Sequence, residues 1–116
     1  MMKKLFQKEK TVHLVLNRDQ INCIIPILDK ELKRLAPIQQ LNNNDSVAFV
    51  NANRYCRILK GKTVVVLPFT KEERGELLWL MVLLMCEADK VEDKQTKDNL
   101  NSIAARIQCV HRKLGV

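Results

Sequence analysis

The 116 residues, with a mass of 13.4 kDa, are enough for one domain, and 47% apolar with 28% charged residues excludes a disordered chain. Only 4% of the residues are aromatic, which argues against a surface that stacks nucleic-acid bases. The formal net charge of +7 lies entirely in residues 1–62, because residues 63–116 carry as many acidic as basic side chains. Such an asymmetry is typical of a protein with an acidic partner, although it also serves solubility.

The first predicted elements are a strand over residues 11–16 and a helix after it. The strand segment is rich in β-branched and aliphatic residues. Asn17 and Gln20 have the spacing of a capping box, which predicts the start of the helix. Apolar residues then recur at helical spacing over residues 21–35, and Pro26 among them predicts either a kink or the first turn.

A second helix is predicted over residues 46–60. Asp45 and Ser46 are suitable N-cap residues, and Gly61 is well placed to end the helix in the left-handed conformation. A hairpin that turns at residues 60–61 is the alternative, and three nearby asparagines weaken the prediction of a helix.

Residues 63–69 form the clearest predicted strand, and the longest predicted helix follows at residues 71–91, with a capping box of Thr70 and Glu73. Ten consecutive apolar residues make this helix apolar on every side, which predicts burial on every side. Such burial is hard to arrange in a small monomer, so we expect a homo-oligomer, and a central position of the helix within the fold is the alternative. The residues expected to form the core or the subunit interface are Leu77, Trp79, Leu80, Met81 and Leu84.

A charged link at residues 92–97 precedes the last predicted helix. Apolar residues recur three and four apart from Leu100 to Leu114, and Gly115 ends the helix. The fold is therefore expected to be α+β and mostly helical, with about four helices packed on a minimal strand pair in one domain, residues 1–116.

The predicted elements repeat in the order strand, helix, helix. Related residues of the two runs lie 53 positions apart, as in the pairs Cys56 with Cys109 and Ala52 with Ala105. The pattern suggests a βαα-βαα internal duplication, with pseudo-repeats at residues 11–62 and 63–116, in which the two strands pair.

The cysteines and acidic residues do not predict a metal site. The four cysteines lie about thirty residues apart without a C-x-x-C pair, which excludes a zinc framework. We expect them to be reduced thiols that fill small core positions. The acidic residues at positions 87–93 lack the glycine of a calcium-binding loop. No metal and no cofactor is expected.

Location and source are predicted from apolar runs and composition. The longest apolar run is ten residues, too short to cross a membrane, and charges interrupt the N-terminal region where a secretion signal would need an apolar segment. The expected location is cytoplasmic. Abundant Lys, Asn and Ile are what AT-rich codons give, which suits a low-GC bacterium or its phage.

The sequence favours a protein that is not an enzyme. His13 lies in the first predicted strand, and His111 lies two residues from Cys109 on a helix, where the two side chains point in different directions. No nucleophile elbow, P-loop, dinucleotide fingerprint or H-E-x-x-H motif occurs, and three glycines do not supply a phosphate-binding loop.

The candidate partner-binding residues are Arg54, Arg57, Lys60 and Lys62, here called the basic cluster. On a helix, Arg54 and Arg57 would lie beside Asn51 and opposite the apolar residues. We expect a small cytoplasmic interaction protein, of a phage or mobile element, that binds an acidic macromolecule through this cluster. One alternative is a nucleic-acid-binding regulator that uses the same helix face. Another is a protein that sequesters a small anionic ligand at a subunit interface.

Overall fold

The computed structural model describes residues 10–115, which form four α-helices and one two-stranded antiparallel sheet. The elements in chain order are β1 (Val12–Leu16), α2 (Arg18–Leu35), α3 (Asn43–Leu59), β2 (Val65–Phe69), the 3-10 turn η1 (Lys71–Glu73), α4 (Arg74–Lys90) and α5 (Lys94–Gly115). The predicted α+β, mostly helical fold with four helices on a minimal strand pair is confirmed.

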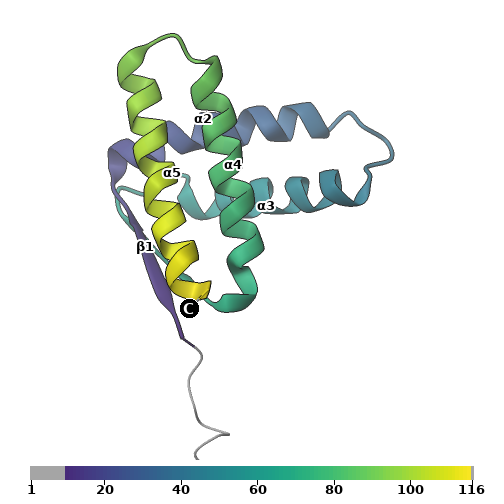
Figure 1. Cartoon of the computed structure of the whole chain (residues 1–116). Coiled ribbons are helices and arrows are strands. Elements are labelled where there is room, and N and C mark those ends of the chain that lie inside the picture. The colour runs from purple at the N-terminus through teal and green to yellow at the C-terminus, as the bar shows by residue number, and fades with distance from the viewer. Residues whose placement is uncertain (1–9, 116) are drawn as a thin grey trace, which may run out of the picture.

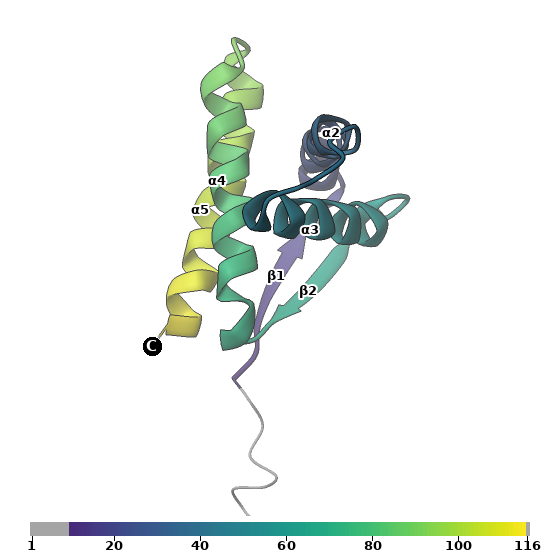
Figure 2. The same cartoon turned by 90° about the vertical axis from the view of Figure 1, so that its right-hand side faces the viewer.

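The four helices form two hairpins that lie across one another (Figure 1). α4 packs against α5 along its length, and α2 packs against α3. The strands lie below α3 in Figure 2, and β1 also contacts α5. A strand pair alone is marginally stable in water, so the helices that cover its inner face are what hold it together.

The two strands alternate between the core and the surface in register. Leu14 pairs with Leu67, and both are buried, whereas the next pair, Val15 with Val66, is exposed. This period of two is typical of a sheet with one covered face. The inner face of the sheet therefore contributes to the core, whereas the outer face, with His13, Val15, Val66 and Pro68, is exposed.

The pairing of the strands is symmetric about Leu14 and Leu67, which are themselves 53 residues apart. Both strands have the same pattern of buried and exposed residues. The capping boxes that follow the two strands are also 53 residues apart: Asn17 with Gln20, and Thr70 with Glu73. The local geometry around the strand pair is thus pseudo-twofold, which is the arrangement that an internal duplication predicts.

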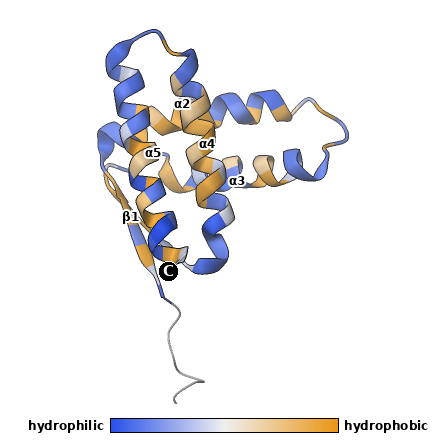
Figure 3. Ribbon diagram, in the orientation of Figure 1, coloured by the Kyte–Doolittle hydropathy of each residue, from blue (hydrophilic) through white to orange (hydrophobic). Residues whose placement is uncertain are grey.

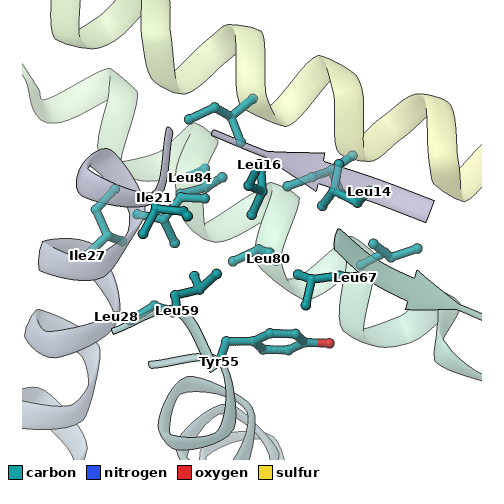
Figure 4. Close-up of a cluster of buried hydrophobic side chains, with 14 of the residues drawn as sticks. Leu14, Leu16, Ile21, Ile27, Leu28, Tyr55, Leu59, Leu67, Leu80 and Leu84 are labelled. Carbon is teal, nitrogen blue, oxygen red and sulfur yellow. The ribbon is translucent and has the colours of Figure 1, made fainter. Parts of the chain in front are cut away.

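The core lies where the helices meet the inner face of the sheet. Leu16 of β1, Ile21 of α2, Leu59 of α3 and Leu80 of α4 gather there (Figure 4). The same cluster of buried residues includes Ile107 of α5, so both halves of the chain share one core.

Residues 46–60 are helical, but α3 begins earlier than predicted. Its N-cap is Asn42, whose side-chain oxygen accepts a hydrogen bond of 2.7 Å from the backbone N–H of Asp45. The prediction of Asp45 or Ser46 as the N-cap is therefore wrong, and Asp45 lies in the first turn, where the helix dipole favours a carboxylate. Gly61 follows the helix with a φ of +77°, as its predicted role requires.

Pro26 lies inside α2, which excludes the first turn, one of its two predicted positions. One other predicted boundary needs correction. α5 begins at Lys94, within the predicted link of residues 92–97, because the Asp93 side chain accepts a hydrogen bond of 2.9 Å from the backbone N–H of Thr96. This is the capping contact that starts the helix.

The prediction that the long helix is buried on every side is wrong. α4 buries one side, which includes Leu77, Leu80 and Leu84. Leu78, Val82 and Met85 lie on the other side and are 45% to 48% exposed. The apolar middle of α4 has no element in front of it in Figure 3. None of the helices in residues 10–115 is long and apolar enough to cross a membrane.

The four cysteines are free thiols, but they do not all fill core positions. Cys56 is buried and Cys23 half-buried, whereas Cys86 and Cys109 are exposed. The expectation of four core thiols is therefore wrong for the last two, which lie on the outer sides of α4 and α5.

Candidate functional site

The basic cluster lies at the C-terminal end of α3 and in the turn that follows. Arg54 and Arg57 are on the helix, and Lys60 and Lys62 flank Gly61 in the turn. All four side chains are exposed. Positive charges here also stabilise the helix, because the dipole places partial negative charge at its C-terminal end.

Arg54 is held by groups within the protein. Its guanidinium lies 2.8 Å from Glu76 and 3.4 Å from Glu73, and it stacks over the ring of Tyr55 at 5.2 Å. The Tyr55 hydroxyl donates a hydrogen bond of 2.7 Å to the same Glu76 oxygen. These contacts join α3 to the start of α4, so Arg54 has a structural role that its sequence position did not indicate.

Lys60 is also paired within the protein. Its ammonium group lies 3.5 Å from Asp29 of α2, and the Cys56 thiol donates a hydrogen bond of 3.2 Å to the same carboxylate oxygen. That thiol, followed by Lys60, lowers the pKa of Asp29. Burial and the Asp29 carboxylate raise the pKa of Cys56, which keeps it a thiol at neutral pH. The contact ties α2 to α3.

Arg57 and Lys62 carry the free charge of the basic cluster. Neither forms an ion pair with another residue in the described part of the chain. Asn51, which the sequence placed beside the arginines, is instead buried at 6% exposure. The cluster therefore divides into two residues that hold the fold and two that are available to a partner.

Two valines on the same side of α3 were not singled out in the sequence. Val47 and Val50 are 56% and 62% exposed, and they precede Arg54 and Arg57 at spacings of three, four and three. Residues with this spacing lie on one side of a helix. We call these four residues the α3 outer face. Their spacing was readable, but only once the buried side of the helix was known.

A shallow depression adjoins the two valines. It has a volume of about 240 Å³ and is lined by Ser46, Val47, Val50 and Asn51. The side-chain nitrogen of Asn51 is buried and makes no hydrogen bond to another described residue. A buried donor without a partner costs about 1–3 kcal/mol, so this amide is an unfavourable feature of the isolated chain.

A cleft of about 560 Å³ lies between the start of α2 and the first half of α5. Its lining is rich in side-chain amides, among them Asn22, Gln95 and Asn99. Among residues 10–115, Asp19 is the only charged residue that lines it, and no lysine or arginine does. A small anionic ligand needs positive charge, so this cleft within one copy of the chain is not suited to bind one. The sequestering alternative places the ligand between two subunits and stays a prediction.

No protein-family model matches the chain, and neither a curated protein nor a solved structure was found to be similar to it.

Proposed function

We propose that this chain is a small interaction protein that acts by binding, not by catalysis, and that its α3 outer face binds an acidic protein partner. The observation that carries this proposal is the pair of exposed valines next to Arg54 and Arg57 on one side of a helix. Burial of apolar side chains supplies affinity at protein interfaces, and arginine at the rim pairs with carboxylates of the partner.

The valines favour a protein partner over a nucleic acid. A helix in the major groove reads bases mainly through side chains that donate or accept hydrogen bonds, and valine could contribute only apolar contact with thymine methyl groups. The net charge of +7 would attract either kind of partner, so the charge alone does not choose between them. Val47 and Val50 occupy two of the four outward positions on this side of α3.

The spacing along the helix describes the complementary surface. Val50 and Arg57 are seven residues apart, which is about 10 Å along a helix axis. The partner should therefore present an apolar patch with carboxylates about that far from it. Arg57 and Lys62 are the cations free to meet those carboxylates, since Lys60 is bound to Asp29.

The depression beside the valines gives a prediction about stability. Replacing Asn51 by leucine should raise the free energy of unfolding by about 1 kcal/mol, because it removes a buried donor that has no partner. Urea unfolding measures the change. The matched control is Asn53→Leu on the same helix, where the asparagine is exposed and no gain is expected. A loss of stability in Asn51→Leu would contradict the expected gain.

The α3 outer face is tested with two charge-introducing variants, Val50→Glu and Arg57→Glu. Arg54 is left unchanged, because a glutamate there would face Glu73 and Glu76. Immobilised wild-type protein should retain a partner from a lysate, and each variant should lower the affinity for that purified partner at least tenfold, or by about 1.4 kcal/mol. The matched controls are Val66→Glu on the sheet and Lys97→Glu on α5, which should bind as the wild type does.

The same experiment distinguishes the alternatives. If nuclease treatment removes the retained material, and the logarithm of its binding constant falls linearly with the logarithm of the salt concentration, the partner is a nucleic acid. That result would favour the nucleic-acid alternative over the proposal. A partner that is lost equally with the two control variants would show that binding does not involve α3.

A further inference from the structure

The exposed side of α4 has the residue spacing of a helix–helix interface. Its outward positions follow one another at intervals of four, three, four, three and four residues, as in the core positions of a coiled coil. These positions, here called the α4 seam, are Lys71, Gly75, Leu78, Val82, Met85 and Asp89. All six are exposed. The seam starts in η1 and runs to the last turn of α4.

The residues of the α4 seam are complementary to the same residues taken in the opposite order. In an antiparallel pair of these helices, Lys71 meets Asp89, Gly75 meets Met85, and Leu78 meets Val82. The first pair joins opposite charges, the second a small and a large residue, and the third two apolar residues. A parallel pair would place lysine against lysine and aspartate against aspartate, which is destabilising.

We propose that a second copy of this chain covers the α4 seam, with the two α4 helices antiparallel and a twofold axis passing beside residue 80. Such an interface is isologous, since the same surface of each copy is used. The two α4–α5 hairpins would then form a four-helix arrangement around the seam.

In the first half of the chain, another helix covers the side of α2 that corresponds to the α4 seam. The α2 positions 53 residues before Leu78, Val82 and Met85 are Ile25, Asp29 and Leu32. α3 packs on this side of α2: Asp29 contacts Cys56 and Lys60, and the other two are partly buried against the core. No element of the described chain covers the corresponding side of α4 (Figures 1 and 2).

Gly75 supplies an independent observation. Gly75 is the second residue of α4, where a glycine costs at most the roughly 0.5–1 kcal/mol that it costs in a helix interior relative to alanine, and a Cβ at this position would meet nothing within 4 Å. The isolated chain therefore gives no packing reason for a glycine. In the antiparallel pair it leaves room for Met85 of the second copy, and methionine is flexible enough to fill an irregular gap.

The size of the seam sets the expected strength. Its positions on α4, residues 75–89, cover about 21 Å of helix, and Lys71 extends the seam into η1; each copy contributes one helix. An interface this small is weak, so the dimer should dissociate on dilution. This proposal is independent of the α3 outer face, which lies on another helix.

The first test is the mass of the full chain in solution over a wide range of concentration, by sedimentation equilibrium. The wild type should pass from monomer to dimer as the concentration rises, and Val82→Glu should stay monomeric. Val50→Glu on α3 is the matched control and should still dimerise. A wild type that stays monomeric at the highest concentration overturns the proposal, as does a dimer that only Val50→Glu dissociates.

The second test concerns the antiparallel register. Lys71→Glu alone and Asp89→Lys alone should each raise the dissociation constant of the dimer about tenfold, and the double variant should restore the wild-type value. Circular dichroism of each variant checks that the helices remain. If the double variant is weaker than either single variant, the antiparallel pairing is wrong.

Discussion

Replacing Leu80 by glutamate should leave no folded protein, whereas the same change at Val82, two residues further along α4, should leave the fold intact. Leu80 is 2% exposed and lies in the core beside Leu16 and Leu59, whereas Val82 is 48% exposed (Figure 4). Loss of a core leucine costs about 3 kcal/mol, and a buried carboxylate without a partner costs several more. Together these costs are comparable to the whole stability of a small domain, about 5–15 kcal/mol.

Far-UV circular dichroism and urea unfolding measure this difference. The Leu80→Ala variant allows the effect to be measured, because it should stay folded. Its free energy of unfolding should be about 3 kcal/mol lower than that of the wild type. A Leu80→Glu protein that unfolds cooperatively from a helical state would show that α4 buries a different side from the one described.

Stability should fall above about pH 10 because of Tyr55. Burial, followed by the hydrogen bond to Glu76, raises the pKa of Tyr55 far above its ordinary value of about 10. The unfolded chain releases this proton near pH 10 and the folded chain retains it. The stability contribution is therefore intact below about pH 10 and is lost as the pH rises, by up to about 1.4 kcal/mol per pH unit.

The chain contains one tyrosine, so its ultraviolet absorbance reports this ionisation without interference from another tyrosine. The tyrosinate signal should appear together with the loss of helical circular dichroism. Burial also raises the pKa of Cys23 and Cys56, which act in the same direction from about pH 9, and the Tyr55→Phe variant separates the tyrosine contribution from theirs.

Tyr55→Phe should itself lower the free energy of unfolding at neutral pH by about 1.5–3 kcal/mol, through loss of the hydrogen bond to a carboxylate. The slope of stability against pH above pH 10 should then be smaller than in the wild type. Tyrosinate formation in a chain that remains fully helical would contradict the buried position of Tyr55.

Local chemical signals predicted much of the fold. The strands are marked by β-branched runs, both capping boxes by residues three apart, and the end of α3 by Gly61. Each of these features depends on neighbours in the chain. The start of α5 had a comparable signal, since Asp93 and Thr96 are also three apart, but the surrounding charges suggested a link.

Features set by tertiary packing were not predictable. Ten consecutive apolar residues contain no periodicity, so nothing in them indicates that Leu80 faces the core while Val82 faces outward. The internal role of Arg54 depends on Glu76, which is 22 residues away and reaches it only after α3 and α4 have crossed. The candidate site was thus predicted by its charges, and its valines became visible only when the buried side of α3 was known.

The two halves that the symmetric strand pairing relates also have chain ends that lie close together. The Lys10 side chain donates a hydrogen bond of 2.5 Å to the backbone carbonyl of Lys113, so the start of β1 and the end of α5 lie next to each other. A circular permutant that joins these neighbouring ends and opens at the exposed turn around Gly61 would exchange the two halves. Because each half runs strand, helix, helix, the permutant would have the same order of elements as the natural chain. The order of elements is therefore the same whichever half comes first in the chain.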